Sequence, residues 1–180
     1  MEKRSFILVV VVILFLAHRV SATAEEAVLK FINEDAATEV GQLIDEGLGL
    51  DCRFKAERTM LHEAVSHNAP KTMQLLLSRG INPNAPDDHG ICPLHLVASY
   101  EDRSKIADTL LACKLLIIDP QDQHGLTPLH FAVTLNNFYM IKELIAKGAD
   151  PSICDEDEED AVAKARGVSS ILGLLLSKKS

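Results

Sequence analysis

Apolar residues recur three and four positions apart in short segments of the chain, which is the spacing of an amphipathic helix. Two neighbouring segments show it, and their apolar faces are made by Leu129, Ala132, Val133, Ile141, Leu144 and Ile145. Thr127 can cap the first helix, and Pro128 suits its first turn, where no amide donor is needed. We expect the second helix to run from about Phe138 to Lys147 and to end at Gly148, a natural left-handed cap.

The same helix pair occurs several times along the chain. Its first helix begins with TMLH at residues 59–62, CPLH at 92–95 and TPLH at 127–130, spaced by 33 and then 35 residues. Its second helix ends in LIDEG at 43–47, LLSRG at 76–80 and LIAKG at 144–148. The loops before two of the first helices share DDHG at 87–90 and DQHG at 122–125. A fixed period near 33 residues indicates one supersecondary unit stacked repeatedly.

These motifs resemble the ankyrin repeat, and the resemblance covers most of residues 25–177. It implies an all-α ankyrin-repeat solenoid of stacked helix-turn-helix units, with about three full repeats between two degenerate caps. It also implies that the histidine of each quartet is structural and that its imidazole bonds the backbone of the adjoining loop. The residues expected to build the repeat are Thr59, His62, Pro93, His95, Thr127, Pro128, His130, Gly80 and Gly148.

The expected repeat domain covers residues 25–178. Its parts are an amino-terminal cap at 25–54, repeats at about 55–87, 88–121 and 122–154, and a carboxyl-terminal cap at 155–178. Terminal units are usually degenerate because only one side of each is buried. The inner face of the first cap is expected to comprise Val28, Leu29, Ile32, Val40, Leu43 and Ile44. The last cap has a first helix of barely two turns, and the loop at 112–118 lacks the expected glycine stop.

In proteins of this family, partners generally dock on the loop tips and on the exposed face of the first helix. Carried over by position in the repeat, the candidate partner-binding residues are Lys55, Arg58, Ser66, His67, Asp88, His89, Ile91, Ser99, Tyr100, Gln123, His124, Leu126, Thr134 and Leu135. Tyr100 is the expected anchor, because tyrosine is enriched at interface hot spots. The resemblance therefore implies a non-catalytic protein-binding module, acting as a scaffold, an inhibitor or an effector.

The amino terminus has the three-part pattern of a secretory signal peptide. Lys3 and Arg4 precede the apolar run FILVVVVILFL at residues 6–16, and small residues follow it at 22–24. The run has 11 residues, whereas a spanning helix needs about 20. We expect cleavage before Glu25, or directly after Ala22, and a protein that is secreted or held in a bacterial periplasm. The alternative is a membrane-anchored protein that retains residues 1–24.

The charge of the chain excludes one class of partner. The chain carries 18 basic and 26 acidic side chains, a net charge of −8 at pH 7. Loss of residues 1–24 removes three basic side chains and one acidic, which leaves 15 and 25 and a net charge of −10. Such a surface repels phosphate backbones, so no nucleic-acid partner is expected. We expect a monomer without cofactor or bound membrane, whose protein partner has a basic surface.

The segment HEAVSH at residues 62–67 is similar to the zinc-hydrolase motif HExxH but has one residue too many. Five positions at about 100° each place His62 and His67 some 140° apart around one helix. They cannot share a zinc ion from a regular helix. A zinc-dependent hydrolase using this pair is kept as the enzymatic alternative, and no metal site is predicted.

Two further groups of residues suggest chemistry. The acidic run DEDEED at residues 155–160 lacks the alternating ligands and the central glycine of a calcium-binding loop, so we interpret it as a solvated loop whose acids precede the last helix. An even number of cysteines in an exported chain permits disulfides. Cys92 begins one helix and Cys113 ends its antiparallel partner, which makes them the candidate disulfide. The alternative is two small buried thiols that never pair.

Overall fold

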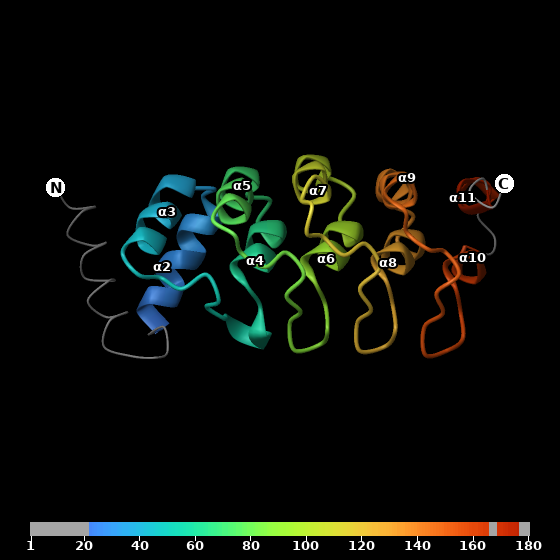
Figure 1. Cartoon of the computed structure of the whole chain (residues 1–180), viewed down its shortest axis with the longest axis horizontal. Helices are drawn as coiled ribbons and strands as arrows, with labels where there is room; N and C mark the ends of the chain where they lie inside the picture. The colour runs from blue at the N-terminus through green and yellow to red at the C-terminus, as the bar shows by residue number, and fades with distance from the viewer. Residues whose placement is uncertain (1–21, 166–168, 177–180) are drawn as a thin grey trace. The chain divides into compact units, whose positions relative to one another are not determined.

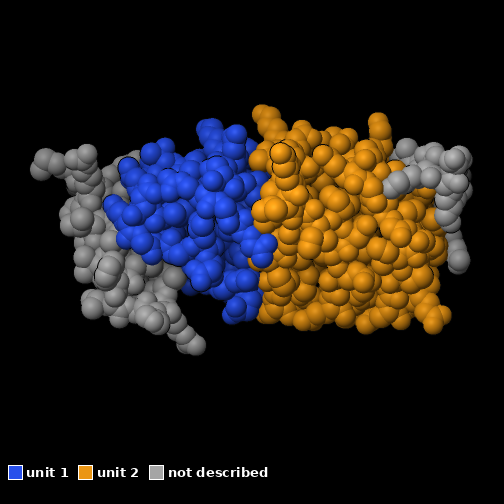
Figure 2. All heavy atoms as spheres, in the orientation of Figure 1, with its two compact units in different colours: residues 1–82 blue, residues 83–180 orange. Residues whose placement is uncertain are grey.

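The computed structural model describes residues 22–165 and 169–176 (Figure 1). The chain forms two compact units, unit 1 at residues 1–82 and unit 2 at residues 83–180 (Figure 2). The described residues form helices and loops, with one isolated bridge between Cys154 and Asp160. The all-α class is therefore confirmed. The expected leader lies outside the described residues, apart from residues 22–24 at the start of the first described helix.

Unit 1 contains two pairs of helices. The first pair is α2 (Ala22–Asn33) and α3 (Ala37–Asp45), and the second is α4 (Met60–Ser66) and α5 (Pro70–Ser78), with the 3₁₀ turn η1 (Lys55–Glu57) between the pairs. Helix α2 packs on α3 and α4, and α5 packs on α3 and α4. Of the residues expected to face inward in the first cap, Val28, Ile32, Val40 and Leu43 are fully buried, and Leu29 and Ile44 are partly exposed.

Unit 2 continues the same pattern. Its helices are α6 (Pro93–Ser99), α7 (Ser104–Leu111), α8 (Pro128–Thr134), α9 (Phe138–Lys147), α10 (Ala161–Lys164) and α11 (Ser169–Leu176). The predicted bounds of α9 are confirmed, and Gly148 ends it in the left-handed conformation at φ 103°. Helix α10 has four residues, a single turn rather than the two expected.

The repeated four-residue motif caps the amino-terminal end of the helix that it begins, through a buried histidine at its fourth position. The backbone N–H groups of Thr59, Cys92 and Thr127 donate to Nδ1 of the histidine three residues later, at 3.0–3.1 Å. Nε2 of His95 then donates to the Leu126 carbonyl at 3.0 Å, and Nε2 of His130 donates to the Glu159 carbonyl at 3.1 Å. This pattern requires the neutral ring with its proton on Nε2. Burial lowers the pKa values of both rings, in agreement with that state.

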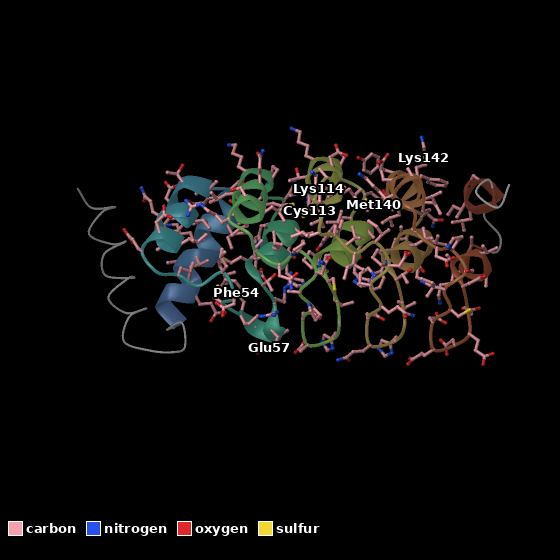
Figure 3. The ribbon with its side chains drawn as sticks, in the orientation of Figure 1. Phe54, Glu57, Cys113, Lys114, Met140 and Lys142 are labelled. Carbon is pink, nitrogen blue, oxygen red and sulfur yellow. The ribbon has the colours of Figure 1, made fainter. Side chains whose placement is uncertain are left out.

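The loop at 112–118, which lacks the glycine expected at the end of its helix, is held by hydrogen bonds to the side chain of Asn84. The Asn84 amide donates to the Leu115 carbonyl at 2.7 Å and accepts from the Ile117 N–H at 2.8 Å. The side chains of both residues are exposed, with exposed fractions of 76% for Leu115 and 55% for Ile117. Figure 3 shows the neighbouring Cys113 and Lys114 just beyond α7.

The candidate disulfide is not formed in this structure. All four cysteines have free thiols, and Cys92 Sγ donates to the Asn84 carbonyl at 3.2 Å. Burial raises the pKa of the Cys92 thiol to about 11 and that of Cys52 to about 12, which keeps both protonated and weakly reactive at neutral pH.

None of the described helices has the length and apolarity of a bilayer-spanning segment.

Candidate functional site

Helices α4, α6, α8 and α10 are each preceded by a hairpin loop, which we call a finger. The fingers comprise residues 54–59 in unit 1 and residues 87–92, 122–127 and 155–160 in unit 2. In every finger, the N–H of the first residue donates to the carbonyl of the fifth at 2.8–3.1 Å. The three fingers of unit 2 begin with aspartate, whose Oδ1 accepts the N–H groups two and four residues later at 2.8–3.0 Å. This double acceptor holds the hairpin rigid.

The fingers of unit 2 are also hydrogen-bonded to one another. The Gln123 N–H donates to the His89 carbonyl at 3.1 Å, and the Glu156 N–H donates to the His124 carbonyl at 2.9 Å. A Cβ atom added to Gly90 would lie 2.8 Å from the Gln123 nitrogen, so this close approach requires glycine. The result is a row of fingers with a fixed spacing.

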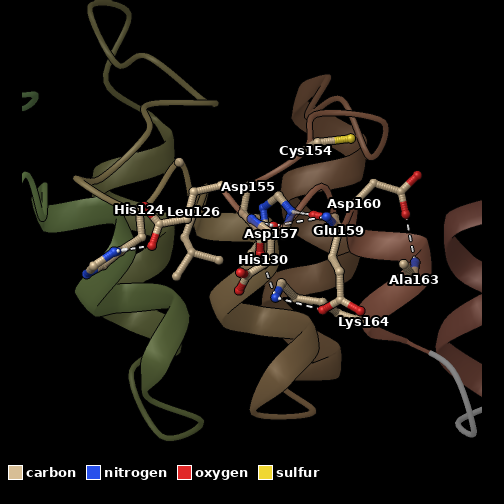
Figure 4. Close-up of polar contacts among 12 residues, drawn as sticks. His124, Leu126, His130, Cys154, Asp155, Asp157, Glu159, Asp160, Ala163 and Lys164 are labelled. Atoms are coloured by element: carbon tan, nitrogen blue, oxygen red, sulfur yellow. Dashed lines mark hydrogen bonds and ion pairs between the residues drawn. The ribbon is translucent and has the colours of Figure 1, made fainter.

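The acidic run is the third finger of this row. Residues 156–159 are exposed, in agreement with a solvated loop, and only the first residue of the run departs from that interpretation. Asp155 is buried, and both of its carboxylate oxygens have partners: Oδ2 pairs with Lys164 Nζ at 2.7 Å, and Oδ1 caps the finger (Figure 4). These bonds lower the pKa of the Asp155 carboxyl, the Lys164 contact contributing most. Asp160 caps α10 by accepting the Ala163 N–H at 2.7 Å. The signal was available in the sequence, since Asp155 follows Asp122 by 33 residues.

The second and third positions of each finger in unit 2 form its tip. The candidate residues Asp88, His89, Gln123 and His124 lie there and are exposed. His124 Nδ1 lies 2.7 Å from Glu156 Oε1 of the next finger, and this carboxylate raises the pKa of His124. The candidates Ile91 and Leu126 are not at the tips. They occupy the fifth position, where each is half-buried.

The finger of unit 1 is built differently. Phe54 replaces the aspartate and buries its ring at the base of the finger, with 8% of the residue exposed. Ala56 and Glu57 both adopt left-handed conformations, at φ 61° and 55°. Such conformations are unfavourable for non-glycine residues by about 1–3 kcal/mol each. Figure 3 shows Glu57 at the outer tip and Phe54 at the base.

This finger, α2 and α4 enclose a groove of about 380 Å³, the unit 1 groove. Its lining residues are Glu25, Leu29, Phe54, Lys55, Ala56, Arg58, Glu63 and Ser66. The Arg58 guanidinium donates to Glu63 Oε1 at 2.7 Å, to the His62 carbonyl at 3.2 Å and to Ser66 Oγ at 2.5 Å. The structure thus brings the candidates Lys55, Arg58 and Ser66 into one site. The volume is within the range of about 300–1,000 Å³ typical of ligand sites.

The remaining candidates lie where the first helices end. Tyr100, the expected anchor, is half-buried, and the Arg103 guanidinium lies 4.8 Å from its ring centre. The Ser99 hydroxyl donates to the His95 carbonyl at 2.9 Å, whereas Thr134 and Leu135 are exposed.

Phe138, which was not among the candidates, is 42% exposed close to Leu135 in sequence. The sequence pattern places Phe138 at the start of α9 but does not indicate that its ring is exposed. Its exposed ring adds apolar surface three positions after the predicted contact residue Leu135.

The geometry of the zinc-hydrolase alternative is not met. His62 is fully buried and its Nδ1 is engaged by the Thr59 N–H at 3.0 Å. His67 is exposed, and its Nδ1 lies 3.0 Å from the Glu63 carbonyl oxygen. Within the described residues, no three His, Cys, Asp or Glu side chains are grouped as a metal site.

Helix pairs that each follow a rigid finger and begin with a buried histidine define a class of repeat proteins. The chain belongs to the ankyrin-repeat family. The family model for a single ankyrin repeat matches residues 57–88, and the model for ankyrin repeats in three copies matches residues 86–155. Family membership makes the chain a protein-interaction module.

Three relatives illustrate the range of proteins that contain similar segments. The human transient receptor potential cation channel subfamily A member 1 is 28% identical over 137 residues, which cover 76% of this chain and 11% of the channel protein. Human neurogenic locus notch homolog protein 4 is 33% identical over 92 residues, 51% of this chain and 4% of that protein. A putative ankyrin repeat protein of Rickettsia bellii is 31% identical over 130 residues, 69% of this chain and 35% of that protein. The chain therefore matches only part of the length of each relative.

Proposed function

We propose that this chain is an exported, non-catalytic module that binds a partner protein through the finger tips of unit 2 and the unit 1 groove. The observation that carries the proposal is the construction of the fingers. The aspartate caps and the backbone bonds between fingers hold the tips rigid. The side chains of His89 and His124 on those tips are 72% and 66% exposed. Rigid presentation lowers the entropy lost on binding.

The test is a crosslinking pull-down that compares the wild-type chain with a His89→Ala, His124→Ala double variant. The matched control is Lys147→Ala, an exposed residue at the end of α9. We expect the double variant to recover at least tenfold less partner and the control to recover the wild-type amount. Equal recovery by all three proteins would show that the partner docks elsewhere.

The acidic third finger of unit 2 supports a partner with a basic surface. Glu156, Asp157, Glu158 and Glu159 are all exposed there. Exposed charges are screened by salt, with a Debye length of about 10 Å at 0.1 M. We expect partner binding to weaken as salt is raised from 0.05 to 0.5 M (~tenfold), and a salt-independent affinity would contradict the charge argument.

Export of the chain rests on the leader pattern at residues 1–24. Amino-terminal sequencing of the protein recovered from outside the cytoplasm tests it directly. A mature chain that begins at Thr23 or Glu25 supports the signal peptide. A chain that still begins at Met1 supports the membrane-anchored alternative.

A further inference from the structure

We propose that the unit 1 groove binds an extended peptide segment of the partner, with a bulky apolar side chain in the groove and a carboxylate beside it at Lys55. The inference rests on the proposed function and identifies the chemistry of one of its two surfaces. It concerns a single finger, residues 54–59, and the helices α2 and α4 that face it.

The apolar part of the peptide is indicated by the groove walls. Leu29 of α2 and the Phe54 and Ala56 side chains of the finger supply its apolar lining. A groove of about 380 Å³ is larger than a leucine or phenylalanine side chain and smaller than a folded element. It therefore suits one anchor residue of an extended chain rather than a docked helix.

The carboxylate is indicated by the charges that line the groove. Arg58 and Glu63 neutralise each other at 2.7 Å, and their side chains are only 26% and 13% exposed. Lys55 is exposed, and within the described residues its ammonium forms no ion pair within 4.0 Å. An acidic residue next to the apolar anchor would supply that missing partner. Because Glu25 lines the groove as well, it disfavours a second acid and can accept a peptide N–H.

The construction of the finger gives a reason for this arrangement. Phenylalanine at position 54 removes the carboxylate that caps the other fingers, and it supplies an apolar wall instead. Lys55 is held beside that wall by a turn in which Ala56 and Glu57 are both left-handed. Departures from favourable backbone geometry cluster at binding sites. The fourth residue is left-handed in all four fingers, so the departure particular to this finger is Ala56, which lines the groove.

The first experiment selects peptides from a random 12-residue phage-displayed library on the immobilised full chain. We expect enrichment of a bulky apolar residue with Asp or Glu within two positions of it. Selection on the Lys55→Glu variant should lose the acidic preference, and selection on the matched Lys142→Glu variant should keep it. Lys142 is an exposed lysine of α9 in unit 2 (Figure 3).

The second experiment measures the affinity of the selected peptide by fluorescence anisotropy. We expect Lys55→Glu to raise its Kd at least tenfold and Lys142→Glu to change it less than twofold. Both lysines are exposed, so circular dichroism should show both variants folded. Equal effects of the two substitutions, or a consensus without an acid, would overturn the proposal. A dimer that dissociates in Lys55→Glu would also overturn it and would identify a second copy of the chain as the occupant.

Failure of this inference can be told apart from failure of the proposed function. If the finger-tip double variant loses the partner while no peptide binds the groove, the protein is a binding module and only the groove assignment is wrong. If the partner is recovered equally by all variants, the proposed binding surface itself is wrong.

Discussion

The finger of unit 1 and the third finger of unit 2 reach the same hairpin by different means. Residues 155–160 begin with a buried aspartate that caps two backbone N–H groups and pairs with Lys164. Residues 54–59 begin with a buried phenylalanine, whose side chain can accept no hydrogen bond. In both, the first residue still donates its N–H to the fifth, at 2.8 Å in unit 1 and 3.1 Å in unit 2. A side-chain cap and an apolar anchor are thus alternative ways to fix one turn.

The two fingers share a feature that separates them from the middle fingers. Their fourth residues, Glu57 and Glu158, are left-handed at φ 55° and 60°. Gly90 and Gly125 occupy that position in the other two, at φ 79° and 76°. The hairpin therefore requires this conformation whichever residue is present. The difference between fingers lies in the strain that each accepts and in the side chains that it presents.

The largest effect on stability is expected when Phe54, the apolar anchor of the unit 1 finger, is removed. Phe54→Ala should lower the free energy of unfolding by about 3 kcal/mol, because a buried ring is replaced by a cavity. Phe54→Leu should retain most of that stability, with a loss of about 1 kcal/mol. Urea denaturation followed by circular dichroism measures both. A loss below 0.5 kcal/mol for Phe54→Ala would mean that Phe54 does not fix the finger (threshold roughly the scatter of surface substitutions).

The second-largest effect on stability is expected when the side-chain cap of a unit 2 finger is removed. Asp122→Ala leaves the N–H groups of His124 and Leu126 without their acceptor, at an expected loss of about 2 kcal/mol. Asp122→Asn is the matched control, since its amide oxygen can accept both bonds. If the alanine and asparagine variants unfold at the same urea concentration, the cap does not stabilise the finger.

Relieving the left-handed glutamates should raise stability. Glu158→Gly and Glu57→Gly are each expected to add about 1 kcal/mol, because glycine adopts positive φ without the Cβ clash. Gly125→Ala should act in the opposite direction, since its Cβ would lie 3.1 Å from the Asp155 Cα atom. Thermal unfolding monitored by calorimetry distinguishes these changes. Destabilisation by Glu158→Gly would contradict the assignment of strain.

The smallest effect concerns the charge pair between two fingers of unit 2. Because Glu156 raises the pKa of His124, the pair stabilises the folded chain below pH 6.5 and loses that contribution as pH rises through the raised pKa. In a histidine NMR titration, Glu156→Gln should lower the pKa of His124 toward its ordinary value. Glu101→Gln, at an exposed position of unit 2, should leave it unchanged. Identical His124 titrations in wild type and Glu156→Gln would rule out the pair.

Much of the fold can be predicted from the sequence, because its signals are local. Apolar spacing, Thr127, Pro128 and Gly148 mark helix faces and helix ends within a few residues of themselves, and α8 and α9 have the expected bounds. The site was predicted less completely. Lys55, Arg58 and Ser66 were identified by their positions in the repeat, but no local pattern indicates that they line one groove.

The sequence by itself determined the period of the repeat, the family and the tips that each finger exposes. It did so because helices and hairpins depend on residues close together along the chain. Only the tertiary structure decided that Phe54 and Leu29 line one groove, that Asn84 holds the loop at 112–118, and that Asp155 is buried against Lys164. These residues lie 9 to 33 positions apart in the chain, well beyond the three- and four-residue spacing that marks a helix face, so no local pattern indicates that they come together.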